Sequence, residues 1–568
     1  RRQRQMCIRD SYLQVVDPTA PEITVAGNIK SMIASRLAYQ LDLKGPAMLF
    51  DTACSSGLVA AYNAFRYIQN GECSMAVVGG VKCDILPISA DKETGIGIKD
   101  IQDTSNSDGH TKTFDNNCEG TSTAEGAFAF VFKDLDKAIQ DGDQIHAVII
   151  GGAVNQDGAS NGITAPNADA QSTLIQKAIK DAKIDVNQIS YIEAHGTATK
   201  LGDPIEISGI QKAFSKSTSR KQFCGIGSVK TNIGHMDNVS GLAGLAKIVL
   251  CMKNHILPAS LNFEQPNKNI EFLNSPVYVN STTMSWSDKG EIVYAGINSF
   301  GLSGTNCHLI LKSADAYQMI DENNNDGKGQ YLLPLSAKNV SSLKKLVQRY
   351  ITLLTKRQVN LKNMVFTASV GRMHLNVRVG FIFSSQEELL NLFRRFLKDN
   401  IQDCHDAIFF NEFRVVSEKS DKVRSIDITE QEKNTISEKC VTLIQEGKTQ
   451  ELSQFADLYI QGADVPWSLL YNRENVRRIS LPTYPFEKTR CWVEPSKDRD
   501  TKYGILYKEE LIDSYMRLEC INSLKVDKFW ELNEHRIQNQ SVLPGTGLIE
   551  MIIESAERFN LLLSLIHI

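Results

Sequence analysis

The sequence predicts an α/β protein in which buried strands are covered by helices. Between Tyr12 and about Leu311, short apolar runs rich in Val, Ile and Phe alternate with amphipathic segments. Continuous apolar runs of this length are typical of strands buried on both faces. A polar segment, "DENNNDGKG", then separates this region from a second one with longer helices. We therefore expect layered sheets and helices, followed by at least one further α/β unit.

The individual elements follow from the pattern in chain order. Strands are expected at 47–50, 73–85, 126–132, 145–154, 189–194, 224–230 and 293–300. Helices are expected after Cys54, where apolar residues recur at helical spacing up to Ile68, and at 171–182 and 241–254. Asp203 and Pro204 are expected to be the cap and first residue of another helix.

The composition excludes several function classes. The chain has 568 residues, 42% of them hydrophobic, and a net charge of -4. Without a basic excess, no nucleic-acid partner is expected. No apolar run reaches about 18 residues, so no membrane-spanning helix is expected either. The twelve cysteines lack paired or zinc-type spacing, which favours reduced thiols, a cytoplasmic location and no bound metal.

Cys54 is the first candidate functional residue. In "DTACSSGL" it lies between the apolar run "AMLF" and the predicted helix. A thiol at a helix N-terminus is expected to have a lowered pKa, and backbone N–H groups there can stabilise an oxyanion. A buried, unreactive thiol is the plainer alternative, because most free cysteines are buried.

Two histidines strengthen the nucleophile interpretation. "YIEAHGTATKLGDPIE" places His195 in a loop after a strand, and "GSVKTNIGHMDNVSG" places Lys230 and His235 between a strand and a helix. Loops at the carboxyl ends of strands are where α/β proteins collect active sites. Either histidine alone would more often be structural, whereas a cysteine with two loop histidines is a nucleophile arrangement.

Four motifs together resemble the β-ketoacyl synthase family, in its modular polyketide and fatty-acid branch. They are "DTACSSGL", "EAHGTATKLGDPIE", "SVKTNIGHMDNVSG" and "GINSFGLSGTNCHLIL", and they occur in the family's order. The stretch "TFDNNCEGTSTAEGAF" departs from the commonest family form and resembles the branch whose modules lack their own acyltransferase. Two motifs also depart from the family pattern: Ala198 replaces a glycine, and "DNVSG" follows His235 in place of Glu-Ala-Ala. Neither departure removes a catalytic atom.

The resemblance implies a thiolase-like fold with α-β-α-β-α layers and a Cys-His-His catalytic set. Cys54 would carry the acyl chain as a thioester, while His195 and His235 stabilise the enolate formed by decarboxylation. Lys230 would support the site electrostatically, and the N–H groups of Cys54 and Phe300 would form the oxyanion hole, with Phe300 also as a gate. The implied substrate-binding residues are Thr197, Thr199, Asn298 and Gly301.

The resemblance also implies how the whole chain is divided into domains. Residues 12–312 would be an N-terminally truncated ketosynthase, 313–330 a linker, and 331–497 a flanking subdomain without an acyltransferase. Residues 498–561 resemble the start of a hot-dog dehydratase with His535 as its catalytic candidate, although Asn539 replaces the motif glycine. Residues 1–11 and 562–568 are expected to be non-native ends.

The implied partners follow from this organisation. An acyl carrier protein would deliver both substrates on phosphopantetheine arms, so no cofactor is expected on the chain itself. Because no G-H-S-x-G nucleophile elbow is present, malonyl groups would come from a trans-acting acyltransferase. A homodimer through the ketosynthase is also implied.

Four alternatives to the elongating polyketide enzyme remain. A ketosynthase that only transfers acyl chains usually lacks the first motif histidine, whereas His195 is present. A non-catalytic partner subunit would lack Cys54, and a thiolase would carry a cysteine in place of His235. A fatty-acid synthase condensing enzyme shares the chemistry and is not separated by these motifs.

Overall fold

The computed structural model describes residues 29–83, 106, 108–288, 290–318, 329–398, 407–417, 424–471 and 476–488, together with the backbone of four strands beyond them. The chain divides into two compact units, one formed by Asp51–Lys82 and Asn106–Thr489, the other by Arg1–Phe50, Cys83–Ser105 and Arg490–Ile568. Residues 319–328 of the predicted linker 313–330 lie outside the described residues, and so does His535.

A six-stranded mixed sheet forms the centre of the first part of the larger unit. Its order is β3-β10-β9-β4-β5-β7. The strands are β3 (Ala147–Gln156), β10 (Thr305–Ser313), β9 (Tyr294–Phe300), β4 (Ile189–Glu193), β5 (Cys224–Gly227) and β7 (Val277–Val279). β10 is antiparallel to β3 and β9, whereas β4 is parallel to β9 and β5, and β5 to β7. The parallel strands β4 and β5 therefore end at the same edge of the sheet.

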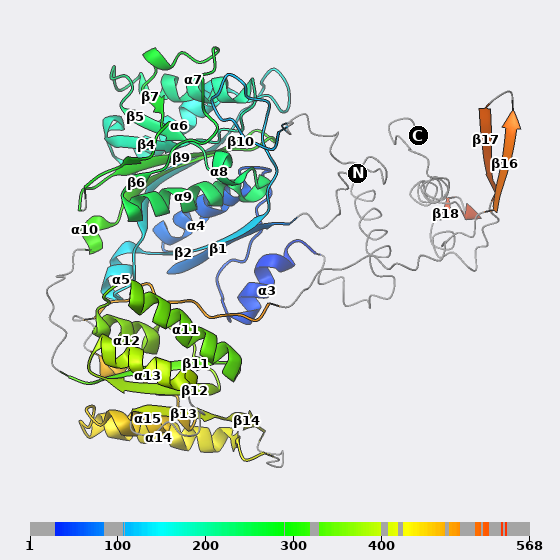
Figure 1. The fold of residues 1–568 in the computed structure, drawn as a ribbon. Helices are drawn as coiled ribbons and strands as arrows, with labels where there is room; N and C mark the ends of the chain where they lie inside the picture. Colours follow the sequence, from blue (N-terminus) through cyan, green and yellow to red (C-terminus); the bar gives the residue numbers. More distant parts are fainter. Residues whose placement is uncertain are drawn as a thin grey trace. The chain divides into compact units, whose positions relative to one another are not determined.

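Helices cover both faces of this sheet (Figure 1). On one face lie α6 (Ala168–Ala182) and α7 (Gly202–Phe214); on the other lie α4 (Ser56–Gln69) and α9 (Ser240–Asn254). A second, antiparallel pair, β1 (Met75–Lys82) and β2 (Gly126–Lys133), packs against the far side of α4 and α9. These elements form four of the five predicted layers, α-β-α-β.

Shorter elements connect these layers. They are α5 (Leu135–Gln140), η2 (Val186–Gln188), α8 (Lys230–Ile233), η3 (Asp237–Val239), β6 (Ile256–Leu257), η4 (Phe272–Asn274), β8 (Met284–Ser285) and α10 (Asp315–Gln318).

The strands predicted for 126–132, 145–154, 189–194 and 293–300 are confirmed. The strand predicted for 73–85 is confirmed over its central residues, and the one for 224–230 only over 224–227, since α8 begins at Lys230. The predicted helices after Cys54 and at 171–182 and 241–254 are confirmed as α4, α6 and α9. The strand predicted at 47–50 is wrong: these residues have no regular structure, and Met48 is 44% exposed. A strand needs a neighbour to pair its backbone groups, which local apolarity cannot supply.

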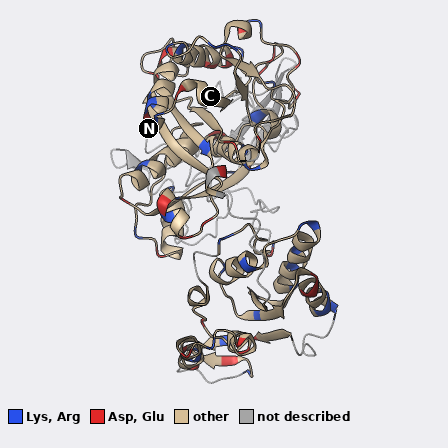
Figure 2. Ribbon diagram, turned by 90° about the vertical axis from the view of Figure 1, so that its left-hand side faces the viewer, with Lys and Arg blue, Asp and Glu red and all other residues tan. Residues whose placement is uncertain are grey.

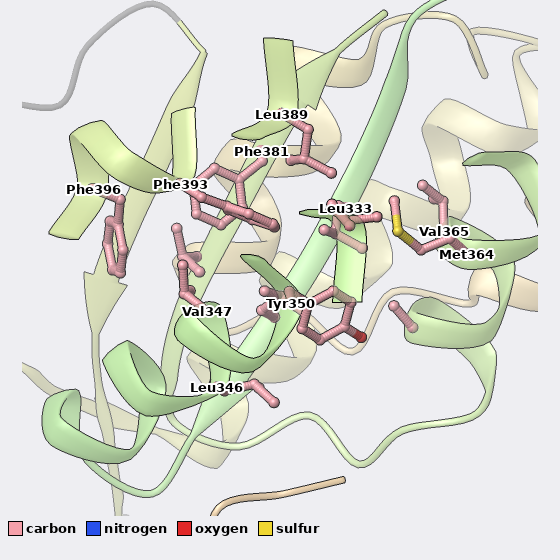
Figure 3. Close-up of a cluster of buried hydrophobic side chains, with 14 of the residues drawn as sticks. Leu333, Leu346, Val347, Tyr350, Met364, Val365, Phe381, Leu389, Phe393 and Phe396 are labelled. Carbon is pink, nitrogen blue, oxygen red and sulfur yellow. The ribbon is translucent and has the colours of Figure 1, made fainter. Parts of the chain in front are cut away.

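A second α/β part, the flanking subdomain, begins at β11. Its antiparallel sheet has the order β11 (Tyr331–Ala337), β12 (Val377–Phe383) and β13 (Ile408–Glu412). One face packs on α11 (Val340–Lys356), α12 (Leu361–Val370) and α13 (Gln386–Lys398), where Phe381, Phe393 and Tyr350 lie in one apolar cluster (Figure 3). The other face packs on α14 (Glu430–Gln445) and α15 (Leu452–Ile460) beside a short parallel pair, β14 (Arg414–Val416) and β15 (Asp427–Thr429). A last 3-10 turn, η6 (Trp467–Leu470), follows.

The segment 476–488 joins the flanking subdomain to the first part. The guanidinium of Arg478 contacts the carboxylate of Asp143, and its backbone N–H donates to the carbonyl of Gly142 at 2.8 Å. The aromatic residues of the phrase that follows, "YPFEKTRCW", predict that it packs back on the first part; the structure describes it up to Lys488. In the structure Tyr484 instead packs against the apolar cluster of the flanking subdomain, and Phe486 is 80% exposed.

The smaller unit contains α3 (Met32–Gln40) and two antiparallel pairs. They are β16 (Leu506–Ile512) with β17 (Tyr515–Ile521), and β18 (Arg536–Ile537) with β19 (Gln540–Ser541).

Acidic and basic side chains of both signs occur in both parts of the larger unit (Figure 2). Among the described residues, no helix is long and apolar enough to cross a bilayer. Nor do the described residues contain a group of three or more side chains able to hold a metal ion.

Candidate active site

Cys54 lies in a tight turn immediately before α4. Ala53 has φ 54°, in the left-handed region, and the helix begins at Ser56. The hydroxyls of Ser55 and Ser56 donate to the carbonyls of Thr52 and Ala53, at 2.8 and 2.6 Å. This local network satisfies backbone groups that a sharp turn leaves unpaired. The predicted turn into a helix is therefore confirmed.

The sulfur of Cys54 has two backbone N–H groups beside it, its own and that of Leu302. Burial raises the pKa of the Cys54 thiol, while the positive charge of Lys230 opposes that shift and Asp237 adds to it. The net direction is upward. The expected lowering by the helix N-terminus is therefore wrong for the free protein, because the cost of a buried thiolate is larger.

Leu302 is a residue that the sequence analysis missed. Phe300 was predicted to supply the second N–H, but the N–H at the sulfur comes two residues later, from the turn between β9 and β10. Gly301 shapes this turn, since a Cβ there would lie 2.3 Å from the carbonyl oxygen of Thr52. The sequence "SFGLSGTN" predicts a turn, but not which N–H of that turn faces Cys54.

His195 follows β4 and is fixed through its own backbone. Its N–H donates to Glu206 Oε1 at 2.8 Å, and its carbonyl accepts a hydrogen bond from the ammonium of Lys230. The ring lies 5.7 Å from that of Phe300 and 5.8 Å from that of His235, centroid to centroid. Burial, with the charge of Lys230, holds the pKa of His195 well below its ordinary value, so this imidazole is neutral.

His235 is held by the chain that follows it. The backbone N–H of Asp237 donates to Nδ1 of His235 at 2.9 Å, and the hydroxyl of Ser240 lies 2.7 Å from the same atom. Burial, with the charges of Lys230 and Lys82, lowers the pKa of His235 to about 3. Because Nδ1 accepts a hydrogen bond in a neutral ring, the proton is on Nε2.

Lys230 is 3% exposed, and its ammonium donates to the backbone carbonyl of His195. Burial lowers its pKa, and the negative charges of Glu206, Glu193 and Asp203 oppose that effect. Lys230 in turn acts electrostatically on Cys54, His195 and His235, which places it among the three predicted catalytic side chains.

Three other predicted residues lie in or behind the His195 loop. Thr197 Oγ1 and Thr199 Oγ1 are 3.3 Å apart, and Thr199 Oγ1 accepts the N–H of Gly202 at 3.0 Å. Asn298, predicted to bind substrate, is 3% exposed, and its amide contacts Glu206 and His308. In the structure Asn298 therefore lies behind the site and serves the protein's own network.

Asp203 does not cap a helix as predicted, because α7 already begins at Gly202. Its fully buried carboxylate accepts the backbone N–H of Phe114 at 2.7 Å, and burial raises its pKa to about 7. Ala198, which replaces the family glycine, has φ 57°. The loop thus keeps a backbone conformation suited to glycine despite the Cβ.

The buried histidines make the chain sensitive to acid. In the folded chain His235 and His308 each have a pKa of about 3, against an ordinary value of 6.5. As the pH falls below 6.5, the unfolded chain binds protons that the native chain does not. The free energy of unfolding therefore decreases by about 1.4 kcal/mol per pH unit for each histidine. The pKa of Asp203 is raised in the folded chain, so the native chain takes up this proton before the unfolded chain does. As the pH falls, Asp203 therefore increases the free energy of unfolding and offsets part of this loss.

This pH dependence is measurable as a difference between two proteins. Denaturant unfolding of the wild type and of His308→Gln between pH 4.5 and 6 should give slopes that differ by about 1.4 kcal/mol per pH unit, the wild type being steeper. Equal slopes would show that His308 is not held neutral in the fold.

Family models match most of the first part of the chain and the beginning of the flanking subdomain. The N-terminal domain of β-ketoacyl synthases matches residues 10–138, and the C-terminal domain matches residues 146–264. The ketoacyl-synthetase C-terminal extension matches residues 266–381.

Curated relatives include the polyketide synthases PksL and PksM of Bacillus subtilis. PksL is 36% identical over 546 residues, which is 93% of this chain and 11% of PksL; PksM is 34% identical over 543 residues and is covered to 12%. The chain thus spans about a tenth of the length of these relatives.

Solved structures agree with these matches. The ketosynthase from module 6 of the bacillaene synthase of Bacillus subtilis 168, solved as a mutant, has a TM-score of 0.71 and 35% identity, with 82% of this chain and 78% of that chain covered. Ketosynthase twelve of the bacillaene synthase in Bacillus amyloliquefaciens has a TM-score of 0.69 and 33% identity, with 83% and 77% covered. The chain therefore has the thiolase-like ketosynthase fold with its C-terminal extension, and it belongs to the β-ketoacyl synthase family in the branch of the polyketide synthases.

Proposed function

We propose that this chain forms carbon–carbon bonds by decarboxylative Claisen condensation, with Cys54 as the acyl carrier and a malonyl thioester as the extender. The observation that carries the proposal is the pair of neutral imidazoles, His195 and His235, whose ring centroids are 5.8 Å apart and whose pKa values are both lowered by burial and by the charge of Lys230. A neutral imidazole can donate a hydrogen bond to a developing enolate oxygen.

In the first half-reaction, the sulfur of Cys54 attacks the carbonyl carbon of an incoming acyl thioester. The thiol proton passes to the departing pantetheine sulfur, so the acyl group moves from one sulfur to the other. The N–H groups of Cys54 and Leu302 stabilise the tetrahedral oxyanion. Lys230 lowers the cost of thiolate character on the attacking sulfur.

In the second half-reaction, the malonyl thioester loses its carboxylate as CO2, and the electron pair of the broken bond forms an enolate. The Nε2–H of His235 and the ring of His195 stabilise the enolate oxygen. The enolate carbon then attacks the acyl carbon on Cys54, whose sulfur leaves as the thiolate and takes up a proton from the solvent. The product is a β-ketoacyl thioester two carbons longer.

The substrates of this proposal are thioesters on the phosphopantetheine arm of an acyl carrier protein. Thr197 and Thr199, neighbours in the half-buried His195 loop, are proposed to lie along that arm. Gly301 is proposed to let the arm approach the turn that carries Leu302. No cofactor of the chain's own enters these steps.

The wider assembly is proposed on the same basis. A trans-acting acyltransferase would supply the malonyl groups, because the described residues from 331 to 488 form a small flanking subdomain and the sequence lacks a G-H-S-x-G elbow. A homodimer through the ketosynthase and a dehydratase beginning near residue 498, with His535 as its candidate residue, complete the proposal.

The activity is tested by separating the two half-reactions. The wild type, His195→Ala and His235→Ala are treated with an acyl-pantetheine thioester and then with malonyl carrier protein, and CO2 release is measured. All three should become acylated, while both variants should release CO2 about 100-fold more slowly or worse. His255→Ala, a change outside the site, is the matched control and should behave as the wild type.

Two results would contradict the proposal. Variants that release CO2 as fast as the wild type would remove both histidines from the chemistry. A wild type that is acylated but never releases CO2 would favour the alternative, a ketosynthase that transfers acyl chains without elongating them.

A further inference from the structure

His308 lies outside the predicted catalytic set but is bonded to it. It lies in β10 directly opposite Asn298 of β9, in a register where the two side chains share one face of the sheet. His308 is 1% exposed, and its Nδ1 is 2.6 Å from Asn298 Oδ1. A buried histidine with one short, directional contact is well placed to orient its neighbour.

Backbone N–H groups determine which atom donates and which accepts in the hydrogen bonds that join Glu206, Asn298 and His308. The N–H groups of His195 and Gly196 donate to Oε1 and Oε2 of Glu206, both at 2.8 Å, so both oxygens are acceptors. The group that Asn298 presents to Glu206 Oε1, at 2.8 Å, is therefore its Nδ2 amide. Its Oδ1 then faces His308 and accepts a hydrogen bond from the Nδ1–H of that ring.

This series of hydrogen bonds ends at the backbone of His195, whose peptide groups determine where the ring lies. Glu206 holds the N–H of His195, and Lys230 holds its carbonyl. Without the donor on His308, the amide of Asn298 has no partner for its oxygen and can rotate. Rotation would replace the Nδ2 contact at Glu206 by an oxygen facing a carboxylate, which is repulsive.

We propose that His308 is a positioning residue, which fixes the His195 loop through Asn298 and Glu206. The inference rests on the proposed function for the role of His195. In this proposal His308 does not contact the substrate.

The surroundings of His308 favour one fixed ring. A Cβ on Gly296, two residues before Asn298 on the same strand, would lie 2.8 Å from His308 Cε1, so the ring fills the space beside that glycine. Burial lowers the pKa of His308 to about 3, which keeps the ring neutral and the Nδ1 proton in place across the physiological range.

The test compares two substitutions of His308 with a control in the same strand, each in the full chain. His308→Leu removes the donor, and His308→Gln keeps an N–H donor. Leu311→Ala removes buried volume from β10 outside the hydrogen-bonded group. Four quantities are measured: amide hydrogen exchange of the segment 194–199, the rate of Cys54 acylation, and kcat and KM for condensation with malonyl carrier protein.

In His308→Leu the amide hydrogens of His195 and Gly196 should exchange at least about 10-fold faster than in the wild type. The reason is that the carboxylate of Glu206, which accepts both N–H groups, is no longer held in place. Its kcat for condensation should fall about 30-fold, while KM and the acylation rate stay within about 3-fold. His308→Gln should restore most of both losses. Leu311→Ala, despite its cavity, should leave exchange in this segment unchanged.

Unchanged exchange in His308→Leu, or equal changes in Leu311→Ala, would overturn the inference. If His308→Leu does not fold, Asn298→Ala removes the next link and must accelerate the same two amides. The exchange measurement needs no substrate. It therefore decides the positioning role even if the wild type fails to condense, a result that would count against the proposed function alone.

Discussion

Replacing Cys54 with alanine is expected to abolish acyl transfer to the chain. With the wild type, an acyl-pantetheine thioester should add the acyl mass to the peptide that contains Cys54. With Cys54→Ala no adduct should form, because among the cysteines that the structure describes no other thiol combines two N–H groups at the sulfur with a nearby ammonium. Peptide mass spectrometry after digestion measures both the mass and its position.

Cys73→Ala is the matched control, because Cys73 is half-buried like Cys54 but lies in the loop after α4. It should be acylated as the wild type is. An adduct that persists in Cys54→Ala, or one that disappears in Cys73→Ala, would remove Cys54 from the first half-reaction.

Replacing Lys247 with methionine should destabilise the chain by about 3–5 kcal/mol, since it removes the ion-pair partner of a buried carboxylate. Lys247 in α9 lies 3.0 Å from Glu193 in β4, and the two side chains are 8% and 1% exposed. Glu193 also accepts the hydroxyl of Tyr191 at 2.9 Å and the backbone N–H of Val229. The pair thus joins β4, the segment before Lys230 and the helix after His235.

Denaturant unfolding measures this loss, and two further proteins isolate its cause. Lys253→Met, on the exposed side of the same helix, should change stability by less than about 0.5 kcal/mol. The double variant Glu193→Gln with Lys247→Met should recover a large part of the loss, because the uncompensated charge is gone. Equal losses in Lys247→Met and Lys253→Met would show that the ion pair does not hold these elements together.

Two strands of the large sheet, β7 and β10, were not predicted from the sequence. Periodicity did predict β3, β4, β5 and β9 and the helices α4, α6 and α9, because these strands are apolar runs and these helices have an apolar face. The strand expected at 47–50 failed because pairing depends on a distant neighbour that local apolarity does not encode. The placement of Tyr484 on the flanking subdomain likewise depends on contacts far away in sequence.

The candidate site also contains residues that could be predicted from the sequence and residues that could not. Cys54, His195, His235 and Lys230 could be selected because reactive residue types occur at the ends of strands and helices. Leu302 could not, since it contributes only a backbone N–H, and every residue in the turn has one. The network behind His195 was also missed: Glu206 and His308 act through buried hydrogen bonds whose partners are up to 92 residues away along the chain.

The direction of the Cys54 pKa shift shows a further limit of sequence reasoning. A helix N-terminus lowers a thiol pKa, but the amount of burial decides the net direction, and burial is a property of the folded chain. The same burial that disfavours the thiolate keeps His195 and His235 neutral.

The most direct test of the central claim is the mass of the carrier protein after one turnover. The chain is first acylated on Cys54, separated from excess thioester, and mixed with malonyl carrier protein; intact-mass spectrometry then follows both proteins. The account predicts that the acyl mass disappears from Cys54 while a β-ketoacyl carrier accumulates. Its β-ketoacyl group should be two carbons longer than the acyl group that Cys54 carried. An acyl mass that stays on Cys54, or that moves to a carrier without lengthening, would contradict condensation at this site.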